Sequence, residues 1–374
     1  MSPNRTRRIG FGLLLVLSPA RAASADDEQR EGWAHVVDAT KRLEKGDYQG
    51  AESALDQVPA KHAAAKDAAQ VRAALANALG PRARAEATVR TDNILFDVTS
   101  LSLDASMWLS PRLQLTGGAE SVSLRGPEKY SAALFRGTLR ARFGQAAFDA
   151  SADIAGRYWS DTASFVLGGV SGELFPTGQL RVRASVQRDE ELGNYASMQS
   201  HVLRLNALAQ CDLLEWNRVT FSARIQATRY SDDNTLGLAY AWATYALLRS
   251  PLRVELGYAG AYRDTRYSRW DNNTGYFPYM TPLQSWRHGP LASLALRWGP
   301  LEVGGAASIA LIASERDPTT FGFFESRRDT IHREIRGFLR VSGERAFIQA
   351  TYEHLQDGHY YTLQTARLGA FIAL

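Results

Sequence analysis

The sequence predicts an all-β transmembrane up-and-down antiparallel barrel that follows a small α-helical segment. Three observations support this fold class. Apolar and polar residues alternate over most of the chain, tight turns alternate with longer polar connections, and a signal-peptide pattern opens the chain. Such alternation places one face of each strand in an apolar medium and the other in water. At roughly 18 residues per strand and connection, residues 83–374 form about 16 strands, with about 14 and about 18 as limits.

The first 25 residues match an export signal. Arg5, Arg7 and Arg8 precede the apolar run "IGFGLLLVLSPA", and small residues follow it. A basic start, a short apolar core and a small-residue cleavage site define a secretory signal peptide. We expect cleavage after Ala25, with Ala22 as the alternative. The apolar run is too short for a membrane-spanning helix.

Composition limits the function classes. The whole chain has 43 basic and 39 acidic residues, but the signal peptide holds four arginines and no acid, so the remainder is formally neutral. The basic surface that nucleic-acid binding requires is therefore not predicted. Cys211 is the only cysteine, which excludes an internal disulfide and a thiol-based zinc site. The mean hydropathy of −0.27 argues against a helical membrane protein.

Residues 26–82 are predicted to form a helical segment. The stretch is rich in Ala, Glu and Lys, its apolar residues recur at helical spacing, and Gly80-Pro81 ends it. Within it, "LEKGDYQGAESAL" resembles the middle of a tetratricopeptide repeat, with Gly46-Asp47-Tyr48 at the turn and Ala51 where two helices approach. One such unit predicts a helical hairpin or short helical domain. Two interpretations stay open, a module that docks a partner and a spacer or plug-like cap.

From about Ala83 the period changes to two. In "QLRVRASVQR", Leu180, Val182, Ala184 and Val186 share one face, and the polar residues share the other. Similar segments recur near 98–109, 131–143, 147–158, 218–230, 252–263, 300–313, 331–341, 345–353 and 360–374.

The connections between these segments fall into two classes. "SPR" at 110–112 and "SGER" at 342–345 are tight, whereas "RDEELGNYASMQ" and "SERDPTTFGFFESRRD" are long and polar. This pattern is typical of outer-membrane barrels, whose short turns face the periplasm and whose long loops face outside.

A soluble β-sandwich would also alternate. Its dry core, however, would have to desolvate the many arginines that lie opposite the apolar face. Aromatic residues near strand ends also suit the girdles of a membrane barrel. These residues are Tyr158, Trp159, Tyr230, Tyr240, Trp242, Tyr258, Tyr262 and Tyr360.

Arginines dominate the face predicted to line the barrel interior, and acidic residues are interleaved with them. Guanidinium groups bind carboxylates and sugar hydroxyls with fixed geometry. Two interpretations stay open, a charged track for a hydrophilic polymer and an interior cross-braced by Arg–acid pairs. The candidates for lining the lumen and contacting a polymer are Arg136, Arg140, Arg181, Arg183, Arg204, Arg224, Arg253, Arg336 and Arg340.

The connection "SRWDNNTGYFPYMTPLQSWRHG" at 268–289 is the richest in aromatic residues. Aromatic faces beside amide and guanidinium donors suit sugar rings, although the same composition suits a loop that packs on itself. The candidates for contacting sugar in this extracellular loop are Trp270, Tyr276, Phe277, Tyr279 and Trp286.

The predicted architecture resembles the outer-membrane porins for exopolysaccharide secretion, such as the export porin for poly-N-acetylglucosamine and the barrel of the cellulose-secretion subunit. "GYFPYMTP" at 275–282 resembles the Tyr-Phe-x-Pro segment that those barrels carry before a late strand. Those proteins usually carry many helical repeats, whereas this chain carries one at best. The resemblance implies a porin in the outer membrane of a Gram-negative bacterium, with the helical segment in the periplasm. The partners it implies are outer-membrane lipid, the barrel-assembly machinery, a polysaccharide, and periplasmic or inner-membrane secretion components.

Catalysis is not predicted. Ser200-His201 and "HLQDGH" are the suggestive neighbourhoods, but adjacent strand residues point to opposite faces, so Ser200 does not serve His201. We find no lipase serine motif, metal-ligand spacing or phosphate loop, and we expect neither metal nor cofactor. The leading hypothesis is a passive conduit for an exopolysaccharide. The alternative is a general-diffusion or structural barrel whose helical segment docks a periplasmic partner.

The chain ends "RLGAFIAL", which resembles the C-terminal signal that the barrel-assembly machinery recognises. Arg367 fills its polar position, Gly369 its glycine, and Ile372 and Leu374 its last two positions, where aromatic residues are usual. We expect the octet to be the closing strand of the barrel, paired with the first strand near residues 85–91. Leu368, Ala370, Ile372 and Leu374 would then face lipid.

Overall fold

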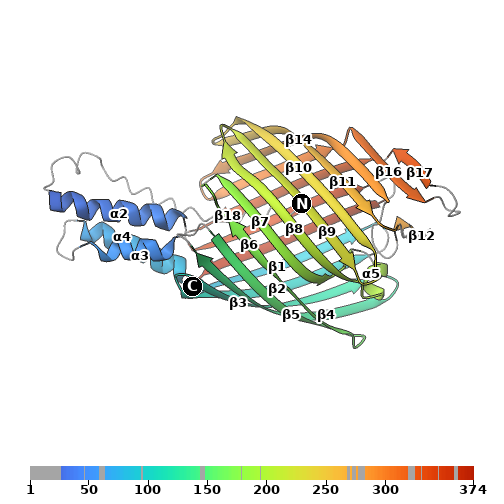
Figure 1. The fold of residues 1–374 in the computed structure, drawn as a ribbon, viewed down its shortest axis with the longest axis horizontal. Coiled ribbons are helices and arrows are strands. Elements are labelled where there is room, and N and C mark those ends of the chain that lie inside the picture. The colour runs from blue at the N-terminus through green and yellow to red at the C-terminus, as the bar shows by residue number, and fades with distance from the viewer. Residues whose placement is uncertain are drawn as a thin grey trace. The chain divides into compact units, whose positions relative to one another are not determined.

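The structure is a computed structural model. It describes residues 27–374 except 46, 59–63, 94–95, 144–147, 178, 194, 268–269, 272–274, 277–282, 319–324, 330, 344 and 358–360. The predicted signal peptide lies outside the described residues. The chain divides into two compact units, of which the first holds three helices and the second holds nearly all of a large sheet (Figure 1).

Three helices follow one another at the start of the described chain: α2 (Asp27–Lys45), α3 (Tyr48–Asp56) and α4 (Ala65–Leu79). The Asp47 carboxylate caps α3 by accepting a hydrogen bond from the Gly50 amide at 3.0 Å. Ala51 is fully buried, as expected for a small residue where two helices approach. None of the described helices has the length and apolar character needed to cross a membrane.

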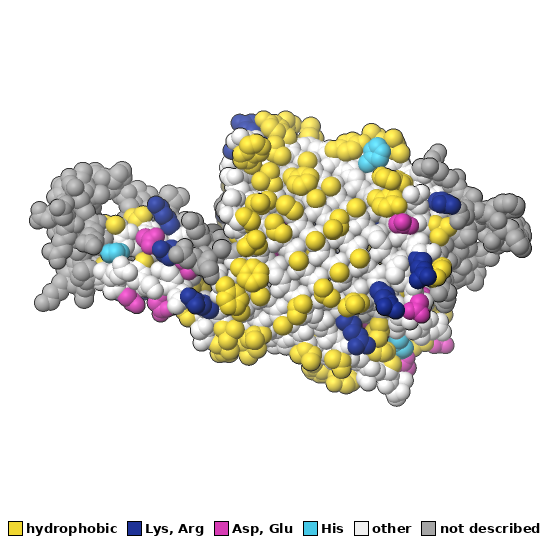
Figure 2. Space-filling model, viewed as in Figure 1, with side chains coloured by type: hydrophobic (Ala, Val, Ile, Leu, Met, Phe, Trp, Pro, Cys, Tyr) yellow, Lys and Arg dark blue, Asp and Glu magenta, His cyan; other side chains and the backbone are white. Residues whose placement is uncertain are grey.

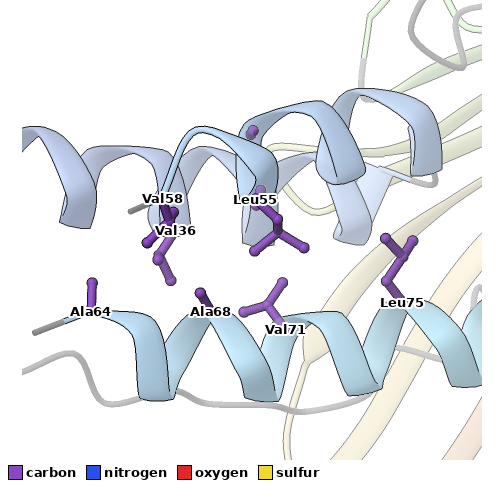
Figure 3. Packing of buried hydrophobic residues seen from close by; sticks show 9 residues of the cluster. Val36, Leu55, Val58, Ala64, Ala68, Val71 and Leu75 are labelled. Atoms are coloured by element: carbon purple, nitrogen blue, oxygen red, sulfur yellow. The ribbon is translucent and has the colours of Figure 1, made fainter. Parts of the chain in front are cut away.

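The helices bury apolar side chains of their own. Val36 of α2, Leu55 of α3 and Val71 of α4 are each at most 1% exposed, and they meet in one cluster (Figure 3). Burying each such side chain stabilises the folded state by about 1.5–3 kcal/mol. This unit therefore has a hydrophobic core that is independent of the strands.

The strands follow in chain order. The first eight are β1 (Arg82–Asp92), β2 (Asp97–Ser110), β3 (Leu113–Arg125), β4 (Lys129–Phe143), β5 (Phe148–Trp159), β6 (Ser164–Leu174), β7 (Leu180–Glu190) and β8 (Leu203–Trp216). A short helix, α5 (Tyr195–Gln199), lies between β7 and β8. The remaining strands of the ring are β9 (Val219–Tyr230), β10 (Thr235–Leu248), β11 (Leu252–Thr265), β14 (Gln284–Trp298), β15 (Leu301–Ile309), β18 (His332–Ser342), β19 (Ala346–Asp357) and β20 (Tyr361–Ala373).

These strands form a closed antiparallel barrel, as the sequence predicts. β1 pairs with β2 on one side and with β20 on the other, so the described sheet has no free edge there. The sheet contains eighteen described strands because it includes β16 (Ile312–Pro318) and β17 (Glu325–Asp329). β16 continues the path of β15, since both pair with β14, so the ring itself has sixteen strands.

A small hairpin stands apart from this sheet. It consists of β12 (Trp270–Asp271) and β13 (Gly275–Tyr276), which pair only with each other among the described strands. It lies in the connection between β11 and β14.

Exposed apolar side chains define the outer face of the ring. Ile154, Val166 and Ile225 are 66%, 64% and 63% exposed, and they alternate along their strands with covered residues. Figure 2 shows such side chains spread over the viewed face of the strands, with charged side chains lying toward the ends of that face. An apolar band of this kind is stable in lipid and not in water.

Candidate functional site

The inner face of the ring lies opposite the exposed apolar side chains. On β7, Val182 and Val186 are 36% and 44% exposed on the outer face. Arg181 and Arg183 occupy the intervening positions, and their side chains are only 18% and 31% exposed. Successive strand side chains point to opposite faces, so these arginines point into the ring.

Asp212 of β8 shows how an inner-face arginine is held. Arg181 donates to its Oδ2 from Nε at 2.9 Å and from Nη2 at 2.5 Å. Ser222 Oγ donates to Oδ1 at 2.6 Å, and Gln210 Nε2 donates at 2.8 Å. Four donors from three neighbouring strands thus satisfy one carboxylate, and the guanidinium is fixed in orientation.

Seven of the nine predicted lumen arginines form ion pairs with described carboxylates. Besides Arg181–Asp212, these pairs are Arg136–Asp104, Arg140–Asp149, Arg183–Glu173, Arg204–Glu191, Arg253–Glu255 and Arg336 with both Glu334 and Glu353. For these seven residues, the structure shows an interior cross-braced by Arg–acid pairs, which is one of the two interpretations of the sequence.

Arg224 and Arg340 differ from the other seven. Among the described residues, Arg224 forms no ion pair, and its guanidinium lies 5.9 Å from the centre of the Tyr240 ring. Arg340 Nε donates to Ser342 Oγ at 3.1 Å, and its guanidinium lies 4.2 Å from the Phe347 ring centre. Both side chains therefore keep donors that no described carboxylate engages.

A second charged cluster surrounds Asp357, the last residue of β19. Arg287 Nη1 donates to both carboxylate oxygens at 3.1 Å, and Arg263 Nη1 donates to Oδ2 at 3.3 Å. His332 Nδ1 lies 3.3 Å from Oδ1. The Asp357 and His332 side chains are only 11% and 9% exposed. None of these residues is among the lumen candidates predicted from the sequence, because their strands meet only in the folded ring.

The connection between β7 and β8 folds into one end of the ring. We call residues 191–202, which include α5, the mouth segment. Met198 of α5 is 1% exposed and packs in a cluster with inner-face side chains from β2 to β5, namely Val98, Val122, Leu124, Ala132 and Trp159. Figure 1 shows α5 at the end of the ring where β12, β16 and β17 lie. Apolar side chains can line this part of the inner face because α5 covers them.

Arg90 of β1 holds the mouth segment from another wall. Its Nη2 donates to the carbonyl oxygens of Leu192 and, at 3.2 Å, Gly193. The guanidinium also lies 5.4 Å from the Phe96 ring centre. Strands β2 to β6 separate β1 from β7 in the ring. The mouth segment therefore reaches across the interior and narrows this end.

Glu190 anchors the mouth segment to the end of β7 and is 1% exposed. Its Oε2 accepts hydrogen bonds from Arg157 Nη1 at 3.1 Å and Trp159 Nε1 at 3.0 Å. Its Oε1 lies 3.0 Å from His201 Nδ1, and Asp161 Oδ2 lies 2.8 Å from His201 Nε2. Both imidazole nitrogens therefore face carboxylates, which favours the doubly protonated ring.

This arrangement shifts the pKa values of two groups in the connections. Burial lowers the pKa of His201, but the hydrogen bonds to Glu190 and Asp161 outweigh burial and raise the pKa above its usual 6.5. The hydrogen bond from His201 lowers the pKa of Asp161 below its usual 3.8. His201 has these two carboxylates as its hydrogen-bonding side chains, so it acts as a bridge in this site.

The aromatic loop candidates occupy different places. Phe277 and Tyr279 lie outside the described residues, as does most of the Tyr-Phe-x-Pro motif. The backbones of Trp270 and Tyr276 pair with each other in the small hairpin. Trp286 lies within β14 rather than in the loop, because β14 begins at Gln284, and it is 47% exposed on the outer face. Its ring centre lies 4.5 Å from that of Tyr262 on the paired strand.

The aromatic residues near strand ends divide between the two faces. Tyr158 and Tyr258 are 55% and 49% exposed on the outer face, as a membrane girdle requires. Trp159 and Tyr230 are each 5% exposed, so the expectation that they belong to the girdle is wrong. They alternate with outward residues and pack inside the ring. Tyr240 and Trp242 share the inward-facing positions of β10, and Tyr360 lies outside the described residues.

Residues 367–373 of the C-terminal octet lie in β20, which closes the ring. Arg367 pairs with Thr88, Gly369 with Glu86 and Ile372 with Ala83 of β1. Leu374 adds a hydrogen bond from its amide to the Pro81 carbonyl oxygen at 2.9 Å. Leu368, Ile372 and Leu374 are 55%, 45% and 69% exposed on the outer face. The first and last strands thus pair in the region that the sequence predicts.

Known proteins match this chain in structure and not in sequence. No family model and no curated protein sequence matches it. A solved structure described as a bacterial polysaccharide outer membrane secretin is similar with a TM-score of 0.60 and 13% identity, covering 79% of this chain and 99% of that chain. CdiB from Acinetobacter baumannii has a TM-score of 0.46 and 7% identity, covering 78% and 60% of the two chains. OccAB4 from the same organism has a TM-score of 0.38 and 8% identity, covering 78% and 96%.

The secretin likeness shows a shared fold, since its identity is too low to carry a shared function. The other two fall below a TM-score of 0.5 and support no further comparison. The chain therefore has the fold of an outer-membrane β-barrel with a short helical part before it.

Proposed function

We propose that the protein is an outer-membrane porin that conducts a secreted exopolysaccharide along its Arg-rich inner face, without catalysis of its own. In this proposal the helical unit lies in the periplasm, and the mouth segment lies at the extracellular end. The polymer would be driven from the inner membrane by secretion components that the helical unit meets.

The braced arginines of the inner face are the observation that carries this proposal. Each ion pair orients a guanidinium, and in this proposal the N–H groups that remain accessible donate to hydroxyl oxygens of a passing chain. A set of weak, preoriented donors suits transport, because a conduit must bind its cargo without trapping it. Pairing with carboxylates also limits the net positive charge that would hold an anionic polymer in place.

Arg224 offers a sharp test because no described carboxylate depends on it. Replacing Arg224 by Gln removes a donor from the inner face without leaving a described acid unpaired. The matched control is Ile225→Ala, the next residue on β9, which is 63% exposed on the outer face. Both variants should assemble, and polymer should block the single-channel current of Arg224→Gln more briefly than that of Ile225→Ala or the wild type.

Exopolysaccharide export by cells provides the decisive measurement. A deletion strain should lose secreted polysaccharide, and the wild-type gene should restore it. Normal export from the deletion strain would refute the conduit. If the purified protein nevertheless conducted ions in a planar bilayer, a general-diffusion barrel would be the better description, with the independently packed helical unit as its docking module.

A further inference from the structure

Three arginines form a row across alternate strands on the outer face, near the ends of those strands. Arg188 of β7 pairs with Leu205 of β8, and Leu205 pairs with Arg229 of β9. Arg229 pairs in turn with Thr235 of β10, whose carbonyl oxygen accepts a hydrogen bond from the Arg266 amide at 3.0 Å. Residues paired directly across strands share a face, so Arg188, Arg229 and Arg266 form a row on alternate strands, roughly 10 Å apart.

This row points outward, unlike the arginines of the inner face. Arg188 and Arg229 follow the outward positions of Val186 and Ile225, which are 44% and 63% exposed. Arg188 and Arg266 are themselves exposed, and the Arg229 side chain is 71% exposed. The Arg229 guanidinium lies 3.3 Å from Asp233, but that carboxylate is 83% exposed, so the pair contributes little.

The row marks a border on the outer face. Apolar side chains lie between the row and the short turns. The long polar connections begin on the opposite side of the row. Figure 2 shows basic side chains gathered at the end of the viewed face, beyond the apolar field. In a membrane, strand ends of this kind lie in the zone where hydrocarbon gives way to lipid headgroups.

One end of the row is built rigidly. Asn234 is fully buried, and its Nδ2 donates to the Tyr267 carbonyl oxygen at 2.8 Å. Its Oδ1 accepts from the Tyr267 amide at 3.0 Å. The Arg266 guanidinium lies 4.9 Å from the Tyr267 ring centre, and that ring is 44% exposed. An exposed guanidinium beside an exposed aromatic side chain presents a phosphate-binding fork next to a surface on which a sugar ring can pack.

We propose that Arg188, Arg229, Arg266 and Tyr267 form an outer-face site for the phosphorylated saccharide headgroup of an outer-leaflet glycolipid. This inference rests on the proposed membrane orientation but not on conduction. Asp233 and the exposed Asp264 of β11 are among the acids near the row, and neither neutralises all three arginines. Clustered basic side chains at a membrane surface attract anionic headgroups, and guanidinium groups bind phosphate through paired hydrogen bonds.

The test compares two triple variants of the full chain. In the first, Arg188, Arg229 and Arg266 are replaced by Gln. The matched control replaces Arg218, Arg297 and Arg345, three exposed arginines at the short-turn end, and removes the same charge. The probe is a purified bisphosphorylated lipid A, and binding to protein in detergent is measured by native mass spectrometry.

The wild type and the control should retain the lipid, and the first variant should bind it about tenfold or more weakly. Dephosphorylated lipid A and phosphatidylglycerol should bind the wild type much less. Equal binding of either competitor, equal loss in both triple variants, or unchanged binding by the first variant would each overturn the proposal. Single-channel conductance of the first variant should match the wild type, so a failure of the conduit would be recognised separately.

Discussion

Glu190 and His201 face each other across the base of the mouth segment, with Glu190 Oε1 3.0 Å from His201 Nδ1. The contact joins the last residue of β7 to the last turn before β8, so it fixes both ends of an inward-folded connection. The cluster raises the pKa of His201 and lowers the pKa of Asp161. Its contribution to the stability of the mouth segment therefore depends on pH.

Replacing His201 by Gln should loosen the mouth segment in a defined pH window. A raised histidine pKa stabilises the fold fully below the ordinary value of about 6.5, and this contribution is lost as pH rises through the folded pKa. A lowered aspartate pKa stabilises above about 3.8, and its contribution is lost as pH falls through the folded pKa. Wild type and variant should therefore differ most between about pH 4 and 6.5, by about 1–3 kcal/mol.

Amide hydrogen exchange at Ser200, His201 and Val202 measures this local opening. Their amides donate to Ala196, Met198 and Ser197. A difference between the two proteins that grows as pH rises above 7, after correction for intrinsic exchange rates, would contradict the assignment.

Replacing Met198 by Asp should displace α5 from the ring. The Met198 side chain is buried among apolar groups, and a carboxylate there would lack partners. We expect a larger single-channel conductance than that of the wild type. The matched control is Gln199→Asp, because Gln199 is the next residue and is exposed. If both variants conducted like the wild type, the mouth segment would not narrow the passage.

Replacing Asp357 by Asn should destabilise the barrel more than the loss of an exposed carboxylate. Arg263, Arg287 and His332 would lose the charge that they share, which costs about 3–5 kcal/mol for a covered cluster. Asp233→Asn removes the carboxylate of an exposed pair and should cost about 1 kcal/mol or less. Equilibrium unfolding in urea from lipid vesicles compares the two. Equal effects would show that the Asp357 cluster is screened like a surface pair.

Gly257 and Gly137 should respond differently to alanine. A Cβ on Gly257 of β11 would run into the Ala243 carbonyl oxygen and would lie 2.8 Å from Thr244 Cα, both on the paired β10. A Cβ on Gly137 of β4 would meet nothing within 4 Å. Gly257→Ala should therefore cost about 1–3 kcal/mol in the same unfolding assay, and Gly137→Ala should be nearly neutral. If Gly257→Ala left the free energy of unfolding unchanged, β10 and β11 would be able to move apart enough to accommodate the added methyl group.

Removing residues 372–374 should abolish assembly. The deletion takes away the pairing of Ile372 and Ala373 with β1 and the Leu374 hydrogen bond to Pro81. The folded band in unheated electrophoresis should disappear. Ile372→Phe with Leu374→Phe keeps the strand length and should retain that band. A truncated chain that still inserted would show that the last strand does not direct assembly.

The barrel could be predicted from sequence because its signal is local. Alternation along β7 or β9 needs only neighbouring residues, and the apolar face follows directly from it. The closing pair could also be anticipated, since a ring must join its first strand to its last. The sixteen strands of the ring agree with the expected number for the same reason.

The interior was harder to predict, because its contacts join strands far apart in the chain. Asp357 meets Arg287 and Arg263 only after the ring has formed, and nothing near Asp357 in the sequence indicates two arginine partners. The mouth segment also reads as a polar loop. One available sign is that Val122 and Leu124 are apolar residues at inward positions of β3, where polar residues are usual. They indicate that something covers this part of the inner face.

The pairing of β1 with β20 bears on how the protein folds. Arg82 and Ala373 are partners, although all the other strands of the ring lie between β1 and β20 in the chain. Such a non-local contact forms only after a large loss of chain entropy, so closure of the ring comes late and slowly. Once it is closed, no strand can be peeled from an unpaired side, and opening requires breaking a whole ladder at once. The β1–β20 pairing that makes closure of the ring slow would then also make unfolding of the closed barrel slow.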